Sequence, residues 1–305
     1  MSYFDAAREA LMELGDDSGL KIYTDVARLD EWTGGFRPGE LIIITAETGS
    51  GKTLLAQQIR ARACRDGYRS LFCSGEMWAR HLLKRELAAA ADVDPSKMRR
   101  EDLITREDMQ ALIEAGALQC ERCWILDGDL DIQRIRRVSR GLKAKGGLDL
   151  VILDYDELIE APGKDENEQL RGLVRATKSI GMELNCIVIL ISQLRKEYGA
   201  TQTQDGRPPS LSRIYGTGAK IKHAGIIIYA DRKWEENLDA DTTKTVLWVL
   251  KNRDGRTGPI PATFNVAKLR FEQAPDPAQK DSGKEDPDCG FDFDERGQPW
   301  PRKPK

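Results

Sequence analysis

The chain of 305 residues is long enough for one large α/β domain or two small ones. Its net charge of −3 excludes a globally basic surface, so any nucleic-acid binding must come from local basic segments. No apolar run approaches the roughly 18 residues of a membrane helix, and residues 1–13 are too charged for a signal peptide. These features predict a cytoplasmic protein without a membrane partner.

Six cysteines fit a reducing compartment better than a disulfide framework. Cys120 and Cys123 have the spacing of a metal-ligand pair, but no second pair follows, and the only histidines are His81 and His223. We expect free structural thiols, with a zinc or redox site as the alternative.

At the N-terminus, residues 4–14 place apolar side chains at helical spacing. An isolated helix this short is marginal in water, so it needs a surface, in its own domain or on a neighbouring subunit. Residues 19–39 then predict an extended lead-in, with turns at 34–35 and 38–39.

The strongest signal is the stretch LIIITAETGSGKT at residues 41–53. It reads as a buried strand, a glycine-rich phosphate loop and the start of a helix, with Ala46 in place of the first glycine of the usual pattern. A chance Gly/Ser turn is the alternative, and the flanking strand and helix argue against it. The predicted nucleoside triphosphate ligands are Glu47, Thr48, Gly49, Ser50, Gly51, Lys52 and Thr53. Lys52 would reach the β- and γ-phosphates, and the Thr53 hydroxyl would hold Mg²⁺.

Acidic residues follow two further predicted strands. Glu76 comes after the strand at 70–73 and could deprotonate a water that attacks the γ-phosphate, or it could be a solvated turn carboxylate. Asp154 ends the strand at 148–154, the Walker B pattern, and would hold Mg²⁺ through water. Asp156 and Glu157 read as loop charges that could simply be solvated.

An apolar strand at 186–191 ends in Ser192-Gln193, where Gln193 can sense the γ-phosphate. The long segment after it, 194–222, is polar and rich in glycine and basic residues, which suits a single-stranded DNA backbone; a solvated mobile loop is the alternative. Its basic residues are Arg195, Lys196, Arg207, Arg213, Lys220 and Lys222, and its aromatic residues are Tyr198 and Tyr215.

Helices are predicted at 80–91, 106–117, 132–145 and 167–184, and further strands at 124–126, 225–230, 244–251, 260–266 and 269–271. Strands that alternate with helices and then follow one another predict an α/β fold, with a mostly parallel twisted sheet and an antiparallel C-terminal extension. Residues 274–305 are acidic and proline-rich and predict a disordered tail. Its aromatic residues could form a docking motif, or the tail could be inert.

Taken in order, these motifs resemble the RecA-like motor domain of replicative hexameric helicases, the DnaB family and the related phage primase–helicases. The matching stretches are GGFRPGEL (34–41), AETGSGKT (46–53), SGEM (74–77), VILDY (151–155), ISQL (191–194), GRPPSLS (206–212), GTGA (216–219) and KNRDGRTG (251–258). Ala46 is usual in that family.

The resemblance implies a RecA-like P-loop core over residues 18–273, preceded by a linker helix over 1–17 that docks onto the next subunit of a hexamer. It implies ATP and Mg²⁺ as cofactors and Glu76 as catalytic base. Lys251 and Arg253 would be inserted in trans into the neighbouring site, and Arg232 and Phe264 would flank the adenine. The DNA loop would include Gly216 and Gly218, with Tyr215 in place of the usual arginine.

The resemblance also implies a function: an ATP-dependent, ring-shaped DNA helicase that moves on single-stranded DNA during replication, in a bacterial or phage-infected cell. The family's N-terminal domain is not seen in this sequence. Replisome partners, namely a primase, loader or polymerase, could dock on the tail. The alternative is a RecA-fold DNA-dependent ATPase, such as a recombinase, loader or regulatory switch, that does not unwind DNA.

Overall fold

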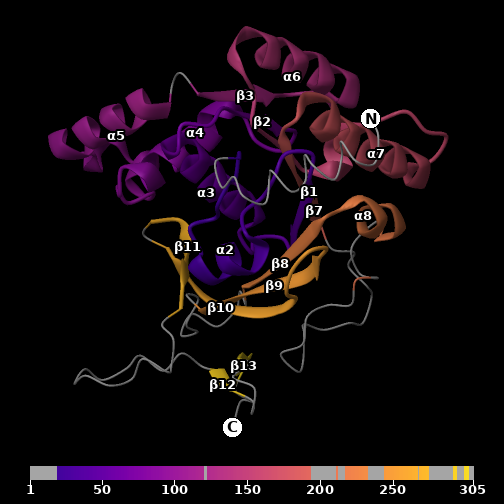
Figure 1. Ribbon diagram of the computed structural model, residues 1–305. Helices are drawn as coiled ribbons and strands as arrows, with labels where there is room; N and C mark the ends of the chain where they lie inside the picture. Colours follow the sequence, from indigo (N-terminus) through magenta and orange to yellow (C-terminus); the bar gives the residue numbers. More distant parts are fainter. Residues whose placement is uncertain are drawn as a thin grey trace.

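The computed structural model describes residues 19–119, 122–193, 211, 217–232, 244–266, 268–274, 291–293 and 299–301. Its centre is a nine-stranded sheet in the order β11-β10-β9-β8-β1-β7-β5-β2-β3 (Figure 1). The six strands from β8 to β3 run parallel, and β9, β10 and β11 extend the sheet in antiparallel pairs. The predicted α/β fold class is confirmed.

The strands of this sheet are between four and nine residues long. They are β1 (Leu41–Ala46), β2 (Ser70–Ser74), β3 (Cys123–Asp127), β5 (Leu150–Asp154), β7 (Ile187–Gln193), β8 (Ile226–Arg232), β9 (Lys244–Asn252), β10 (Gly258–Asn265) and β11 (Arg270–Gln273). Two small ladders lie outside it, β4 (Leu130–Asp131) with β6 (Ile159–Glu160) and β12 (Phe291–Phe293) with β13 (Pro299–Pro301).

Helices cover both faces of the sheet. The α-helices are α2 (Ala27–Thr33), α3 (Lys52–Arg65), α4 (Ala79–Ala90), α5 (Arg106–Gln119), α6 (Ile132–Gly146), α7 (Glu166–Leu184) and α8 (Thr217–His223). Short 3₁₀ turns are η1 (Lys97–Arg99), η2 (Glu101–Leu103) and η3 (Asp156–Leu158). None of the helices described above has both the length and the apolar character that crossing a bilayer requires.

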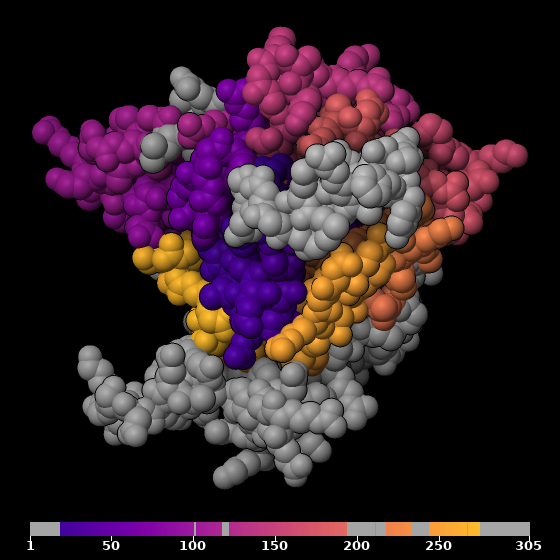
Figure 2. All heavy atoms as spheres, viewed as in Figure 1, coloured from indigo at the N-terminus to yellow at the C-terminus, as the bar shows by residue number. Residues whose placement is uncertain are grey.

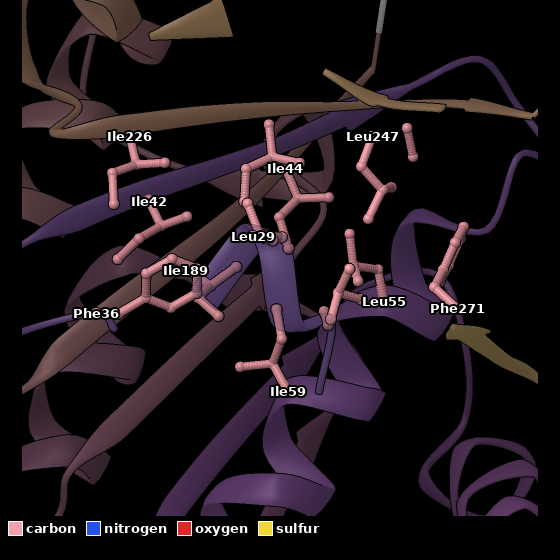
Figure 3. Packing of buried hydrophobic residues seen from close by; sticks show 14 of the residues in the cluster. Leu29, Phe36, Ile42, Ile44, Leu55, Ile59, Ile189, Ile226, Leu247 and Phe271 are labelled. Carbon is pink, nitrogen blue, oxygen red and sulfur yellow. The ribbon is translucent and has the colours of Figure 1, made fainter. Parts of the chain in front are cut away.

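The alternation of side chains along β1 creates two cores. Ile42 and Ile44 point to the face covered by α2 and α3, where they pack with Leu29, Leu55 and Ile59 (Figure 3). Leu41 and Ile43 belong to the opposite core, beneath α6 and α7. Strands buried on both faces lack a polar side, which is why their sequences read as unbroken apolar runs. Strand β1 is buried along its whole length and lies between β7 and β8 in the sheet. On the face of the molecule shown in Figure 2, the indigo surface of the N-terminal part of the described chain lies between atoms of the later strands, coloured orange and yellow.

One prediction about a segment outside the sheet was wrong. The extended lead-in contains helix α2, whose Leu29 and Trp32 are buried and whose C-terminus is closed by Gly34 at φ 66°. A seven-residue helix is stabilised by tertiary packing rather than by propensity, so its sequence signal is weak. In the predicted disordered tail, β12 and β13 pair antiparallel. The predicted helix at 4–14 lies outside the described residues.

Candidate nucleotide site at the carboxyl ends of the parallel strands

The loop between β1 and α3 has the backbone geometry of a phosphate-binding loop. Gly49 and Gly51 adopt φ values of 82° and 94°, which side-chain-bearing residues rarely adopt. Glu47, Thr48 and Gly49 are exposed, whereas Ser50 is buried. Because α3 begins at Lys52, the loop ends at a helix N-terminus, where free N–H groups favour an anion.

Lys52 and Thr53 face the interior of this site. The Lys52 ammonium donates hydrogen bonds to the carbonyl oxygens of Ala46 and Glu47, both at 3.1 Å. Burial lowers the pKa of Lys52, and the carboxylates of Asp154 and Glu76 oppose that shift. Thr53 Oγ1 donates to Asp154 Oδ2 at 2.8 Å. The start of α3 and the end of β5 thus bring together the two residues predicted to hold the metal.

The donor set suits a magnesium ion that also binds phosphate. Asp154 is 1 % exposed, and burial raises its pKa to about 6; a cation beside it would oppose that shift and stabilise the ionised form. Mg²⁺ is commonly held by one or two protein oxygen ligands, with phosphates and water completing its shell. Accordingly, no group of three or more carboxylate, histidine or cysteine side chains forms a metal cage among the described residues.

Glu76 and Gln193 lie at the same edge. Glu76 is exposed just beyond β2, where the Gly75 amide donates to the Asp154 carbonyl at 2.8 Å. Its charge is close enough to raise the pKa of Asp154. Gln193 is the last residue of β7 and the register partner of Ala46, the residue that directly precedes the phosphate loop. All four parallel strands that were expected to carry site residues therefore end around one loop.

The predicted adenine contacts require a correction at Phe264. Phe264 is 1 % exposed, the Arg232 guanidinium lies 4.0 Å from its ring centroid, and the Phe271 ring packs against it in an edge-to-face arrangement with 5.0 Å between the ring centroids. A base cannot stack on a ring that is covered in this way. Phe264 supports Arg232 by a cation–π contact, and the carbonyl of Arg232 lies 3.5 Å from Ser50 Oγ, beside the phosphate loop. Sequence reasoning could not separate a stacking ring from a buried one.

Lys251 and Arg253 lie at the opposite ends of the strands from the phosphate loop. Strand β9 runs antiparallel to β8 and pairs Asn252 with Ile226, the first residue of β8, while Arg232 at the other end lies near the phosphate loop. The length of β8 therefore separates Arg253 from its own phosphate loop by roughly 20 Å, at about 3.3 Å per residue. Arg253 is exposed. Lys251 donates to the carbonyls of Ile221 and Ala224 at 2.5 and 2.6 Å, and so caps α8.

Most of the predicted DNA-binding residues lie outside the described part of the chain: Arg195, Lys196, Arg207, Arg213, Tyr215 and Gly216. Of the rest, Gly218 and Lys222 are exposed. Lys220 is not: it is 0 % exposed, forms an ion pair with Asp156 and donates to Ser192 Oγ at 2.7 Å. In this structure the Lys220 side chain is therefore not exposed for the predicted DNA contact, and Asp156 is buried rather than a solvated loop charge. The burial of these two residues cannot be recognised from the local sequence, because each is buried only through its ion pair with the other.

A second surface feature lies away from the nucleotide site, on α4, η1 and α5. A cavity of about 720 Å³ is lined there by Leu87, Met98, Ile104, Met109, Leu112 and Ile113. Ile113 and Met109 are 59 % and 47 % exposed. Figure 1 shows α5 at the periphery, far from the centre of the sheet. An apolar groove of this kind is typical of a contact with another protein segment.

Comparison with known proteins places the chain in a family. Residues 21–273 match the family described as "DnaB-like helicase C terminal domain". The chain is 31% identical over 259 residues to the replicative DNA helicase DnaC of Bacillus subtilis, covering 82% of this chain and 55% of that protein. It is 29% identical over 254 residues to replicative DNA helicase DnaB of Treponema pallidum, with the same coverage. The chain thus spans about half the length of these relatives.

Solved structures agree on the fold. One of them, described as an ATPase domain, superposes with a TM-score of 0.81 at 22% identity, covering 90% of this chain and 99% of that one. A DnaB-like replicative helicase, solved in a study of its interactions with primase, gives a TM-score of 0.78 at 22% identity, covering 90% of this chain and 67% of that one. The phosphate loop, the Thr53–Asp154 pair and the family match lead to one conclusion: this chain belongs to the DnaB-like helicase C-terminal domain family.

Proposed function

We propose that this chain is the motor of a replicative DNA helicase, which hydrolyses ATP with Mg²⁺ and moves along single-stranded DNA as a ring of identical subunits. The main support for this proposal is that the predicted catalytic groups are divided between the two opposite ends of the strands of one sheet. Lys52, Glu76 and Asp154 surround the phosphate loop, whereas Arg253 is exposed at the far edge. A complete site therefore needs a second copy of the chain.

The roles within one site follow from the contacts. Lys52 and the N–H groups of residues 48–53 would bind the phosphates, and Thr53 with Asp154 would hold Mg²⁺, which neutralises charge on the phosphates. Glu76, exposed and next to Asp154, would accept the proton of the attacking water. Arg232 would lie beside the nucleotide and Gln193 would sense its terminal phosphate. ATP hydrolysis that single-stranded DNA stimulates is the first experimental test.

We propose the segment 194–222, without Lys220, as the DNA-binding element. Two of its cations, Arg213 and Lys222, are replaced by alanine in the test. For single strands, each phosphate contact contributes about −0.7 to the slope of log affinity against log salt concentration. Losing two contacts should therefore reduce the magnitude of that slope by about 1.4. DNA-stimulated ATP hydrolysis should fall while basal hydrolysis persists. Fluorescence anisotropy with a labelled oligonucleotide over a salt series measures the slope.

A matched control replaces Arg137 and Lys145, two exposed cations of α6, by alanine and should keep the parental slope. A Tyr215→Ala variant should weaken binding with little change in slope, because stacking on a base involves no counterion release. Parental affinity and slope in the Arg213/Lys222 variant would show that DNA binds elsewhere.

We also propose that the groove on α4 and α5 receives residues 4–14 of a neighbouring subunit. The groove offers exposed apolar side chains, and the predicted helix offers a complementary face of Phe4, Leu11 and Leu14. Ile113→Asp places a charge in that contact without disturbing the core, because Ile113 is 59 % exposed. This variant and deletion of residues 1–16 should both shift the protein toward monomers at micromolar concentration, as measured by light scattering.

The control for the groove is Val266→Asp, which introduces the same charge at a residue that is 49 % exposed beyond β10. It should keep the parental assembly. If the Ile113 variant and the truncated chain both remain assembled as the parent does, the groove does not hold the ring together.

A further inference from the structure

A buried ion pair lies at the base of the predicted DNA-binding segment. Lys220, on α8, and Asp156, in η3, are paired with both side chains at 0 % exposure. The Lys220 ammonium also donates to Ser192 Oγ, near the end of β7, at 2.7 Å. Three elements that are distant in sequence are therefore joined at one ammonium group, inside the protein.

Each member of this group adjoins a residue of the nucleotide site. Asp156 lies two positions after Asp154, and its charge contributes to the electrostatic environment of Lys52. Ser192 directly precedes Gln193, and Thr45 of β1 is its register partner. Along the chain, residues 194–216 run between Ser192 and the start of α8. Lys220 therefore links the point where the predicted DNA-binding segment leaves the sheet to the helix that follows it.

The C-terminal end of α8 is tied down as well. The Lys251 ammonium bonds the carbonyls of Ile221 and Ala224, and Arg253 is two residues further along the same chain. Helix α8 packs on α7, as Figure 1 also shows. A displacement of η3 would thus be transmitted by Lys220 to the middle of a helix whose C-terminal end is bonded to β9.

We propose that Lys220 is a positioning residue that couples the DNA-binding segment to the Asp154 end of β5, so that stimulation of ATP turnover by DNA depends on the Lys220–Asp156 pair. Two opposite charges inside a protein are costly to separate, so α8 must follow the backbone of η3 when it moves. The inference rests on the proposed function, since it assumes that the segment 194–222 binds DNA.

The first test is Lys220→Met, which keeps the length of the side chain and removes its charge. In the full chain, we expect the ratio of DNA-stimulated to basal ATP turnover to fall by roughly fivefold or more, the lower end of ordinary coupling between sites. Basal turnover and the KM for ATP should stay at parental values, because Lys220 bonds Asp156 and Ser192, which are not among the predicted phosphate and metal ligands. Circular dichroism establishes that the variant is folded at the assay temperature.

The matched control is Lys143→Met. Lys143 is another lysine that joins separate elements, with its ammonium 2.9 Å from the carbonyl of Leu148, but it lies at the other end of β5. It should keep the parental ratio. The double variant Lys220→Met/Asp156→Leu replaces the charge pair by two apolar side chains and should recover most of the stimulation, since no buried charge is left without its partner.

A second measurement does not depend on DNA. Hydrogen exchange of the α8 amides should change when a non-hydrolysable ATP analogue binds to the parental protein, and should no longer respond in Lys220→Met. If the parental enzyme shows no DNA stimulation, the proposed function fails. The exchange measurement still tests whether nucleotide binding is coupled to α8 through Lys220. A folded Lys220→Met variant with the parental stimulation ratio, or with the parental exchange response, would overturn the inference.

Discussion

Glu76→Gln is expected to reduce ATP turnover at least about 100-fold, the usual minimum for loss of a general base, while ATP binding and assembly persist. The amide keeps the size of the side chain but cannot take the proton of the attacking water. Binding should persist because the phosphate loop, Lys52 and the Thr53–Asp154 pair are unchanged. Steady-state hydrolysis and binding of a fluorescent ATP analogue measure the two quantities separately.

Glu157→Gln is the matched control for the base. Glu157 is also exposed and its charge also reaches Lys52, yet it lies in η3 rather than beyond β2. It should keep turnover near the parental rate. Near-parental hydrolysis by the Glu76 variant would remove this residue from the mechanism, whatever the control does.

Arg253→Ala is expected to reduce turnover by about 10³-fold or more, as for other cations supplied to a phosphoryl group in trans, with nucleotide affinity nearly unchanged. Arg253 lies at the sheet edge opposite its own phosphate loop, so its loss leaves the binding site of its own subunit intact. Arg256→Ala, in the same turn and also exposed, is the control and should hydrolyse ATP normally.

Mixing inactive variants tests whether the site is shared. A ring that contains Arg253→Ala and Lys52→Ala subunits has interfaces where an intact phosphate loop meets an intact Arg253. Activity should therefore reappear on mixing, in proportion to the number of such interfaces. Mixed rings that exchange subunits, as followed by fluorescence energy transfer, and yet stay inactive would show that the two residues do not serve one site.

The fold and the centre of the nucleotide site could be predicted from the sequence, because both depend on local patterns. Residues 41–46 are apolar because β1 is buried on both faces, and the glycines at 49 and 51 adopt the positive φ values that a phosphate loop needs. Asp154 was identifiable because an acid that ends an apolar strand lies at the ligand-binding edge of a parallel sheet.

The remaining features depend on contacts between distant residues. Lys220 and Asp156 are 64 positions apart and look like ordinary loop charges until the ion pair between them is seen. Phe264 looks available for stacking until Arg232 and Phe271 cover it. Helix α2 has too few turns for a clear periodicity and depends on the burial of Leu29 and Trp32. In each case the tertiary environment, rather than the local pattern, determines the role of the residue.

Strand separation on a forked DNA duplex tests the central claim most directly. The full chain, assembled with ATP and Mg²⁺, should release the labelled strand, and Lys52→Ala, which lacks the phosphate-binding ammonium, should release none. A chain whose ATP hydrolysis is stimulated by single-stranded DNA, but which separates no strands on forks with either a 5′ or a 3′ loading tail, would contradict the assignment of a helicase motor.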